Sequence, residues 1–148
     1  NALVGELSPV PSGLPPGTRF AGCEVLAVAG TSGSASVYHA RQVEPPRDVA
    51  LKVHTPDPAR PVEAERFRRE AAAVARLAHP RVAPLFATGA ESGRLYLLTE
   101  WLPGGTVQAQ LPALCAVPRR AAVMVRDLAR AVGHAHAAGL FHRDLKPT

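Results

Sequence analysis

The chain has 148 residues, of which 47% are hydrophobic, and this is enough to fill the core of one compact domain. Its two cysteines, Cys23 and Cys115, lie far apart without the spacing of metal ligands, which favours reduced thiols and a cytoplasmic setting. No apolar run approaches the roughly 18 residues of a membrane span. We therefore expect no membrane segment among these residues, and the sequence leaves open an anchor elsewhere in a longer parent protein.

The formal net charge of +5 raises the question of nucleic-acid binding. Arginines are scattered from Arg19 to Arg143 without a dense run, aromatic residues make up 5% of the chain, and no recognised nucleic-acid motif is present. The tight cluster of Arg66, Arg68 and Arg69 is explained by a solvated helix face. We therefore expect no nucleic-acid partner, and a basic nucleic-acid-binding domain stays an outsider among the candidate functions.

A leader rich in proline and glycine is predicted over residues 1–17, because its prolines prevent regular pairing, and we expect it to be flexible. Alternating and β-branched residues then predict three strands, and apolar residues at spacings of four, three and four predict a helix. The strands cover residues 23–29, 36–41 and 48–54, and the helix covers residues 62–78 and is expected to end at His79-Pro80.

Two more strands are predicted over residues 84–87 and 94–100. A turn at residues 101–105 follows, and apolar spacing then predicts a second helix over residues 118–138, capped by Gly139. Five strands and one helix therefore precede the turn and the second helix. This order predicts an α+β fold.

The third predicted strand carries a lysine inside an apolar run. By alternation Lys52 shares one face of the strand with Ala50, whereas Val49, Leu51 and Val53 share the other. A buried ammonium without a counter-charge is costly, so Lys52 needs an acidic partner.

Glu70 offers such a partner, because it lies three residues after Phe67 and so falls on the apolar face of the first predicted helix. A carboxylate in that place is expected to find a cation. The alternative to a pair with Lys52 is a salt bridge on the helix surface with Arg66 or Arg69.

Two motifs resemble those of eukaryotic-type protein kinases. The run His142-Arg143-Asp144-Leu145-Lys146-Pro147 resembles the catalytic loop, and Val49-Ala50-Leu51-Lys52-Val53 resembles the motif of the third strand. The resemblance covers roughly residues 18–148 and is to the serine/threonine kinases of bacteria. It implies a kinase N-terminal lobe with a five-stranded antiparallel sheet and one helix, then a hinge, then the first helices of a C-terminal lobe that is truncated after the catalytic-loop motif.

The resemblance implies roles for the charged residues of these motifs. Asp144 would accept or orient the proton of a substrate serine or threonine hydroxyl, while Lys52 and Lys146 would hold phosphate charge. Glu70 would pair with Lys52 and aim it at the α- and β-phosphates of ATP. Lys52 and Lys146 are also the only lysines among 17 basic residues. A compact ammonium suits phosphate as a point charge, whereas a guanidinium is bulkier and forks.

The adenine subsite is implied by Trp101-Leu102-Pro103-Gly104-Gly105, which resembles the kinase hinge. Thr99 falls at the gatekeeper position, and the backbone of Glu100 and Leu102 would take the adenine edge, because backbone donors and acceptors are fixed by the fold.

The phosphate loop keeps only the first of the three spaced glycines of the family, Gly30, and has Ser32 and Ala35 at the other two positions. Glycine is favoured there because it lets backbone N–H groups approach phosphate without a Cβ in the way. The remaining nucleotide-binding positions that the resemblance implies are Ala29, Thr31, Gly33, Ser34, Val37 and Ala50.

The implied cofactors are ATP and Mg²⁺, and the implied partners are proteins with serine or threonine hydroxyls. No metal site is predicted within the chain, because the family's magnesium ligands are expected downstream of residue 148. The 148 residues alone are therefore expected to be inactive, while the parent phosphorylates proteins. The two missing glycines motivate an alternative, a pseudokinase-like module that binds nucleotides or partners as a scaffold.

Overall fold

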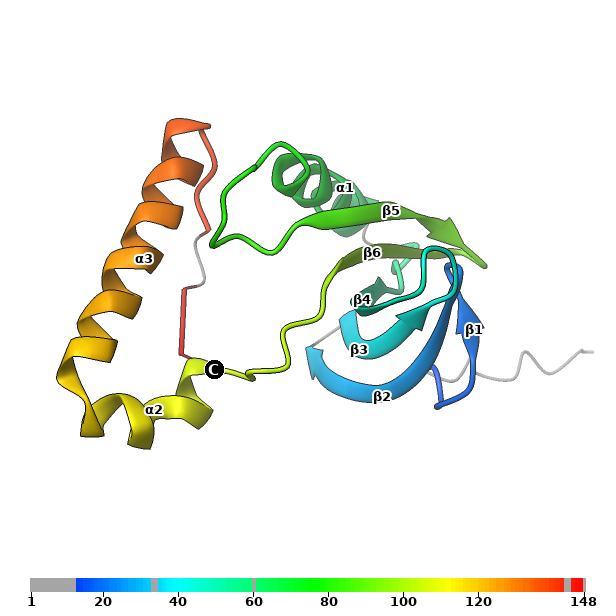
Figure 1. The fold of residues 1–148 in the computed structure, drawn as a ribbon. Helices are drawn as coiled ribbons and strands as arrows, with labels where there is room; N and C mark the ends of the chain where they lie inside the picture. Colours follow the sequence, from blue (N-terminus) through cyan, green and yellow to red (C-terminus); the bar gives the residue numbers. More distant parts are fainter. Residues whose placement is uncertain (1–12, 33–34, 60, 143–144, 148) are drawn as a thin grey trace, which may run out of the picture.

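The computed structural model describes residues 13–32, 35–59, 61–142 and 145–147. Within these ranges a curled sheet and one helix are followed by two further helices, which stand beside the sheet and are joined to it by the segment after the last strand (Figure 1). The elements are β1 (Arg19–Phe20), β2 (Cys23–Ser32), β3 (Ala35–Gln42), β4 (Arg47–His54), α1 (Pro61–Val74), β5 (Leu85–Glu91), β6 (Arg94–Glu100), α2 (Val107–Ala116) and α3 (Pro118–Ala137).

The strands form one antiparallel sheet in the order β1-β2-β3-β4-β6-β5. Its core lies on one face, because alternate residues of the central strands point to the same side. The largest fully buried side chains there are Tyr38, Leu51, Leu98, Val25 and Val49. The predicted α+β fold with an antiparallel sheet is confirmed, and the five predicted strands are all present.

The sixth strand, β1, has only two residues and so shows no periodicity that could predict it. The Phe20 side chain is buried, and its ring meets that of Tyr96 edge to face at a centroid distance of 5.9 Å. The Ala21 N–H also donates to the Glu91 carboxylate at 2.9 Å. These contacts join the β1 end of the sheet to the β5–β6 hairpin, so the sheet curls on itself.

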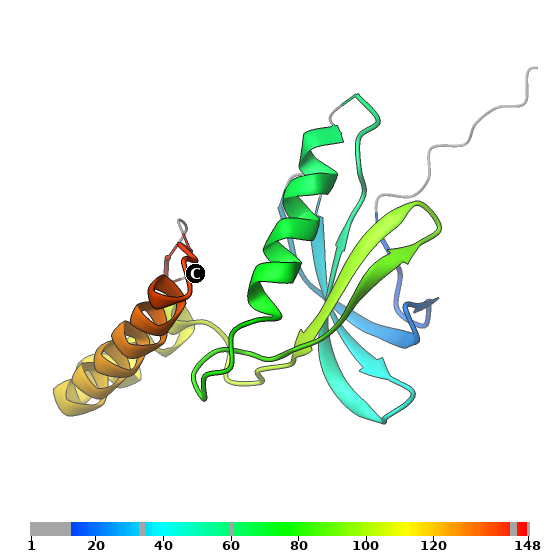
Figure 2. The same cartoon turned by 90° about the horizontal axis from the view of Figure 1, so that it is seen from above.

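Helix α1 lies alongside the sheet next to β5 and β6 (Figure 2). It buries Phe67 and Ala71, which are four residues apart and so share one face. The helix ends at Val74, four residues earlier than predicted. Beyond that residue the backbone tightens, with hydrogen bonds from Arg76 to Ala73 and from Leu77 to Val74 over three residues instead of four.

The sequence does not predict helix α2, because Pro112 lies inside it and its mostly apolar residues show no clear amphipathic periodicity. Its first turn is capped by the Thr106 hydroxyl, which accepts from the Ala109 N–H at 3.3 Å. Helix α3 agrees with its prediction to within a residue. The expected cap is confirmed at Gly139, which has φ +76°, a left-handed value that favours glycine.

The two parts of the molecule touch through the loop that follows α1. Arg81 of this loop forms an ion pair with Asp127 of α3 at 2.9 Å, and the rings of His79 and His134 lie 5.3 Å apart. A hydrogen bond from Arg126 lowers the pKa of Asp127, and the Arg81 charge acts in the same direction. The carboxylate is therefore charged and can hold the loop against α3. Across the described ranges, no helix is both long and apolar enough to cross a bilayer.

The chain before β1 is held by a buried hydrogen bond, in which the Leu14 N–H donates to the Tyr38 hydroxyl at 2.9 Å. Replacing Tyr38 by Phe should lower the free energy of unfolding by about 1 kcal/mol, because the N–H stays buried without its partner. Urea denaturation of Tyr38→Phe measures this. Tyr96→Phe is the matched control, since the structure shows no hydrogen bond of the Tyr96 hydroxyl to any described residue. Equal losses in the two variants would contradict this role of Tyr38.

Candidate active site

Strand register brings five of the predicted nucleotide-binding residues together on the sheet face opposite the core, namely Gly30, Val37, Ala50, Lys52 and Thr99. Residues paired across antiparallel strands share a face, so each set of pairs forms a row across the sheet. The first row joins Gly30, Val37, Lys52 and Leu97. The second row joins Ala27, His39, Ala50 and Thr99. We call these the lysine row and the threonine row.

The predicted phosphate loop is a continuation of β2 and β3. Thr31 pairs with Ser36, and Ser32 pairs with Ala35, so the strands stay paired up to the tip of the hairpin. Ala29 falls at a β-bulge, where the register shifts between Val28 and Gly30. Two predicted binding residues, Gly33 and Ser34, lie outside the described residues.

The expected ion pair between Lys52 and Glu70 is not formed in this structure. Glu70 instead accepts a hydrogen bond from the Arg66 Nε at 3.2 Å, and its side chain is 51% exposed. This is the alternative that the sequence left open. The reason is geometric, because Phe67 and Ala71 take the face of α1 that contacts the sheet, and Glu70 lies one residue away from that face, beside Arg66. A role for Glu70 in nucleotide binding stays a prediction.

Lys52 has an aromatic neighbour instead of a carboxylate. Its Nζ lies 5.9 Å from the centroid of the Phe67 ring, and that ring also stacks on His54 at 5.5 Å. Among the described residues no acid pairs with Lys52. The lysine is half-buried, so a phosphate could approach its ammonium without displacing a competing carboxylate.

The predicted hinge connects β6 to α2. Thr99 is half-buried in the threonine row, whereas Glu100 and Leu102 are exposed. Between these two exposed residues, the Trp101 ring stacks on the His39 ring at a centroid distance of 4.2 Å and an interplanar angle of 14°. One signal for this contact is local, since His39 lies two residues after Val37 and so shares its face of the strand. The stacking partner could not be inferred from alternation.

The predicted catalytic loop is described only in part. Asp144 lies outside the described residues, and so does Arg143. Lys146 is exposed, and the loop is tied to α2 by a hydrogen bond from the Gln108 N–H to the Pro147 carbonyl at 2.8 Å. The catalytic roles of Asp144 and Lys146 stay predictions. No cluster of three or more potential metal ligands occurs among the described residues.

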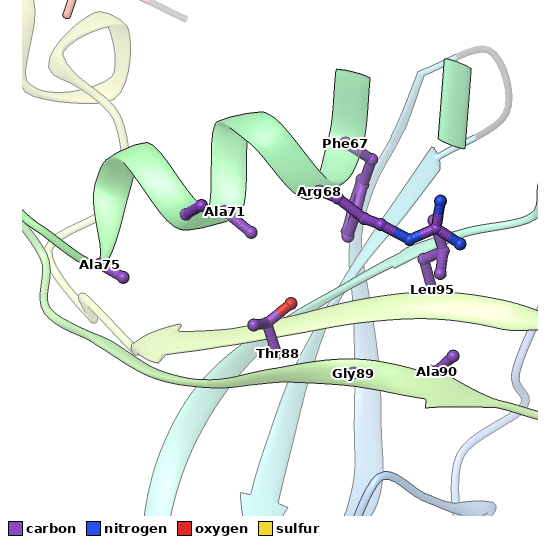
Figure 3. Close-up of a pocket in the computed structure, with 9 residues that line it drawn as sticks. Phe67, Arg68, Ala71, Ala75, Thr88, Gly89, Ala90 and Leu95 are labelled. Carbon is purple, nitrogen blue, oxygen red and sulfur yellow. The ribbon is translucent and has the colours of Figure 1, made fainter. Parts of the chain in front are cut away.

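A separate hollow of about 360 Å³ lies between α1 and the β5–β6 hairpin (Figure 3). Small side chains leave this space open, and its lining includes Phe67, Arg68, Ala71, Thr88, Gly89 and Leu95. The cavity is mostly apolar, and neither Lys52 nor Thr99 lines it. Thr88 pairs with Leu97 of the lysine row, so the hollow lies beyond the β6 end of that row, on the same face of the sheet but separate from Lys52 and Thr99.

Comparison with known proteins agrees with this arrangement. Residues 23–148 match the model of the family described as protein kinase domain. The chain is 35% identical over 132 residues to the serine/threonine-protein kinase PknJ of Mycobacterium tuberculosis. The aligned region covers 88% of the chain and 22% of PknJ. The chain is also 34% identical over 134 residues to the serine/threonine-protein kinase PrkC of Bacillus subtilis. That aligned region covers 88% of the chain and 21% of PrkC.

The fold is also similar to a solved structure. The kinase domain of Mycobacterium tuberculosis PknI superposes with a TM-score of 0.70 at 28% sequence identity, over 91% of this chain and 56% of that one. The chain thus spans about a fifth of the length of the two curated relatives, at 22% and 21%, and about half of the solved kinase domain.

Replacing Glu70 by Gln should change the free energy of unfolding by less than about 0.5 kcal/mol, because exposed pairs at this spacing contribute little. Glu65→Gln is the matched control, since Glu65 pairs with Arg69 on the same helix at 3.0 Å. Urea denaturation measures both variants. A loss of about 3 kcal/mol or more in Glu70→Gln alone would instead identify Glu70 as the partner of a buried cation.

Proposed function

The chain belongs to the protein kinase family, in its serine/threonine branch, and we propose that its full gene product transfers the γ-phosphoryl group of ATP to serine and threonine hydroxyls of proteins. In this proposal residues 18–148 are the first part of the kinase domain and follow a leader over residues 1–17. A cytoplasmic location is part of the proposal, because ATP and free thiols such as Cys23 and Cys115 belong to that compartment.

The observation that carries the proposal is the position of Lys52. Its row partners are Val37 and Leu97, and the adjacent row on the same face holds Ala50 and Thr99. An apolar surface beside an ammonium suits a nucleotide, because the base needs apolar contact while the phosphates need positive charge. In the proposal the hinge backbone at Glu100 and Leu102 takes the base, and the β2–β3 hairpin, which continues the lysine row, takes the phosphates.

In the proposed reaction the substrate hydroxyl oxygen forms a bond to the γ-phosphorus while the bond from that phosphorus to the bridging oxygen breaks, so ADP leaves. Asp144 takes or orients the hydroxyl proton, and Lys52 and Lys146 offset the negative charge on the phosphates. Mg²⁺ would supply further charge neutralisation. The described residues hold no cluster suited to it, so no magnesium site is assigned to them.

Lys52→Met in the full gene product should lower the rate of phosphoryl transfer by at least about 100-fold, because one preorganised charge is lost where negative charge develops. The assay follows labelled phosphate from ATP into a generic serine/threonine protein substrate. Arg69→Met on the exposed surface of α1 is the matched control and should keep full activity. The 148 residues alone are assayed as well and should show no transfer. Unchanged turnover in Lys52→Met would refute the role of this lysine.

A second function, nucleotide or partner binding without catalysis, is favoured by one observation. Ser32 and Ala35, which stand at two glycine positions of the family, pair directly with each other across the hairpin. Each carries a Cβ where glycine would leave room for phosphate.

If this second function is correct, the double variant Ser32→Gly/Ala35→Gly should bind nucleotide measurably more tightly than the natural protein, because backbone N–H groups could then approach the phosphates. Titration with a fluorescent ATP analogue measures the affinity, and Ser92→Gly at the β5–β6 turn, where φ is +49°, is a matched glycine variant remote from the site. No gain in affinity would show that the loop tolerates Ser32 and Ala35, and would favour the active enzyme.

A further inference from the structure

The only tryptophan of the chain lies in the hinge, between the two residues whose backbone is expected to contact adenine. Trp101 stacks on His39, and the two rings are nearly parallel at 4.2 Å and 14°. His39 belongs to the threonine row, where it pairs with Ala50, which in turn pairs with Thr99. The stack therefore ties the hinge to the same face of the sheet that carries the proposed adenine subsite.

The imidazole of His39 is itself held in place. Its Nε2 lies 3.3 Å from an Asp48 carboxylate oxygen, and the Arg41 guanidinium donates to the other oxygen at 2.5 Å. Arg41 and Asp48 are paired across β3 and β4, so the register that forms the rows also forms this contact. The hydrogen bond from Arg41, and to a smaller extent the one from His39, lowers the pKa of Asp48, so its carboxylate stays charged. A chain of contacts thus runs from Arg41 through Asp48 and His39 to Trp101.

The other contacts of the hinge lie toward its two ends, where the Glu100 N–H donates to the Pro84 carbonyl at 3.2 Å and the Gln110 Nε2 donates to the Gly104 carbonyl at 2.7 Å. Leu102, Pro103, Gly104 and Gly105 follow Trp101, Gly105 has φ +71°, and the whole segment lies outside helices and strands. Glycine adds backbone freedom, and a backbone that must present its donors and acceptors to a flat base binds more tightly when it is ordered in advance. A ring stack anchored on two paired strands can provide this order.

We propose that His39 and Trp101 form a brace that positions the hinge backbone for adenine, with Asp48 and Arg41 fixing the imidazole against the indole. These four are positioning residues and touch no phosphate. The proposal rests on the proposed function, since it assumes that the hinge binds adenine. It assigns to this chain a contact that should affect affinity for the base and leave the phosphate end unchanged.

The test compares two ligands that occupy opposite ends of the site. Isothermal titration of the full gene product is carried out with adenosine, which reports the base end, and with inorganic tripolyphosphate, which reports the end near Lys52. His39→Ala should weaken adenosine binding about two- to tenfold, the range expected when one aromatic pair is lost. The affinity of His39→Ala for tripolyphosphate should not change. His39→Phe keeps the stack and should stay within about twofold of the natural protein for both ligands.

Two further variants keep the outcome clear. Asp48→Asn retains both rings but loosens the imidazole, so it should weaken adenosine binding less than His39→Ala does and leave tripolyphosphate binding unchanged. It also keeps the proposal testable if His39→Ala does not fold. His136→Ala removes a histidine whose ring lies against Phe141 at 4.9 Å, far along the chain from the brace, and should leave both affinities unchanged. Circular dichroism checks that each variant is folded.

Trp101 fluorescence gives a second reading on the 148-residue chain, in which it is the sole tryptophan. His39→Ala should raise the quenching of its emission by acrylamide, and His39→Phe should not, because only the first variant frees the indole. Unchanged adenosine affinity in folded His39→Ala and Asp48→Asn, with ATP still bound, would overturn the brace alone. Failure of the natural protein to bind adenosine or ATP at all would overturn the proposed function, and the brace with it.

Discussion

The cross-strand register of β3, β4 and β6 is the constraint on which the rest of the structure depends. Tyr38, Leu51 and Leu98 form one row across these strands, and each is at most 2% exposed. Side chains alternate along a strand, so a slip by one residue would expose this row and turn Lys52 into the core. Burying each large apolar side chain contributes about 1.5–3 kcal/mol, which disfavours the slip strongly. The position of Lys52 is therefore set by packing on the opposite face of the sheet.

The helix beside the sheet is held by fewer contacts than the strands are. Phe67 and Ala71 anchor α1, while the charged side chains of the helix pair with one another along its exposed surface. Lys52 is consequently next to the Phe67 ring, and a cation near an aromatic face gains about 0.5–1 kcal/mol at partly exposed sites. The sheet thus fixes where the lysine lies, and α1 contributes an apolar neighbour instead of a counter-charge.

Strands with strong alternation, and the helix α3 with its glycine cap, could be predicted from the sequence because their signals are local. The two-residue strand β1 and the proline-containing helix α2 could not, since neither repeats an apolar pattern. Helical spacing placed Glu70 near the sheet, but it could not decide between Lys52 and the nearby Arg66. The stack of His39 on Trp101 joins residues far apart in the chain and depends on the hinge conformation. Such contacts follow from tertiary structure alone.

We propose that a nucleotide lies along the lysine and threonine rows and the hinge, and does not enter the hollow between α1 and the β5–β6 hairpin. Amide hydrogen exchange of the full gene product with and without Mg·ATP tests this most directly, because each segment is read separately. We expect slower exchange with nucleotide in residues 27–37, 49–53 and 99–102. Protection confined to α1 and β5 around Ala71 and Gly89, with the rows and the hinge unchanged, would contradict it.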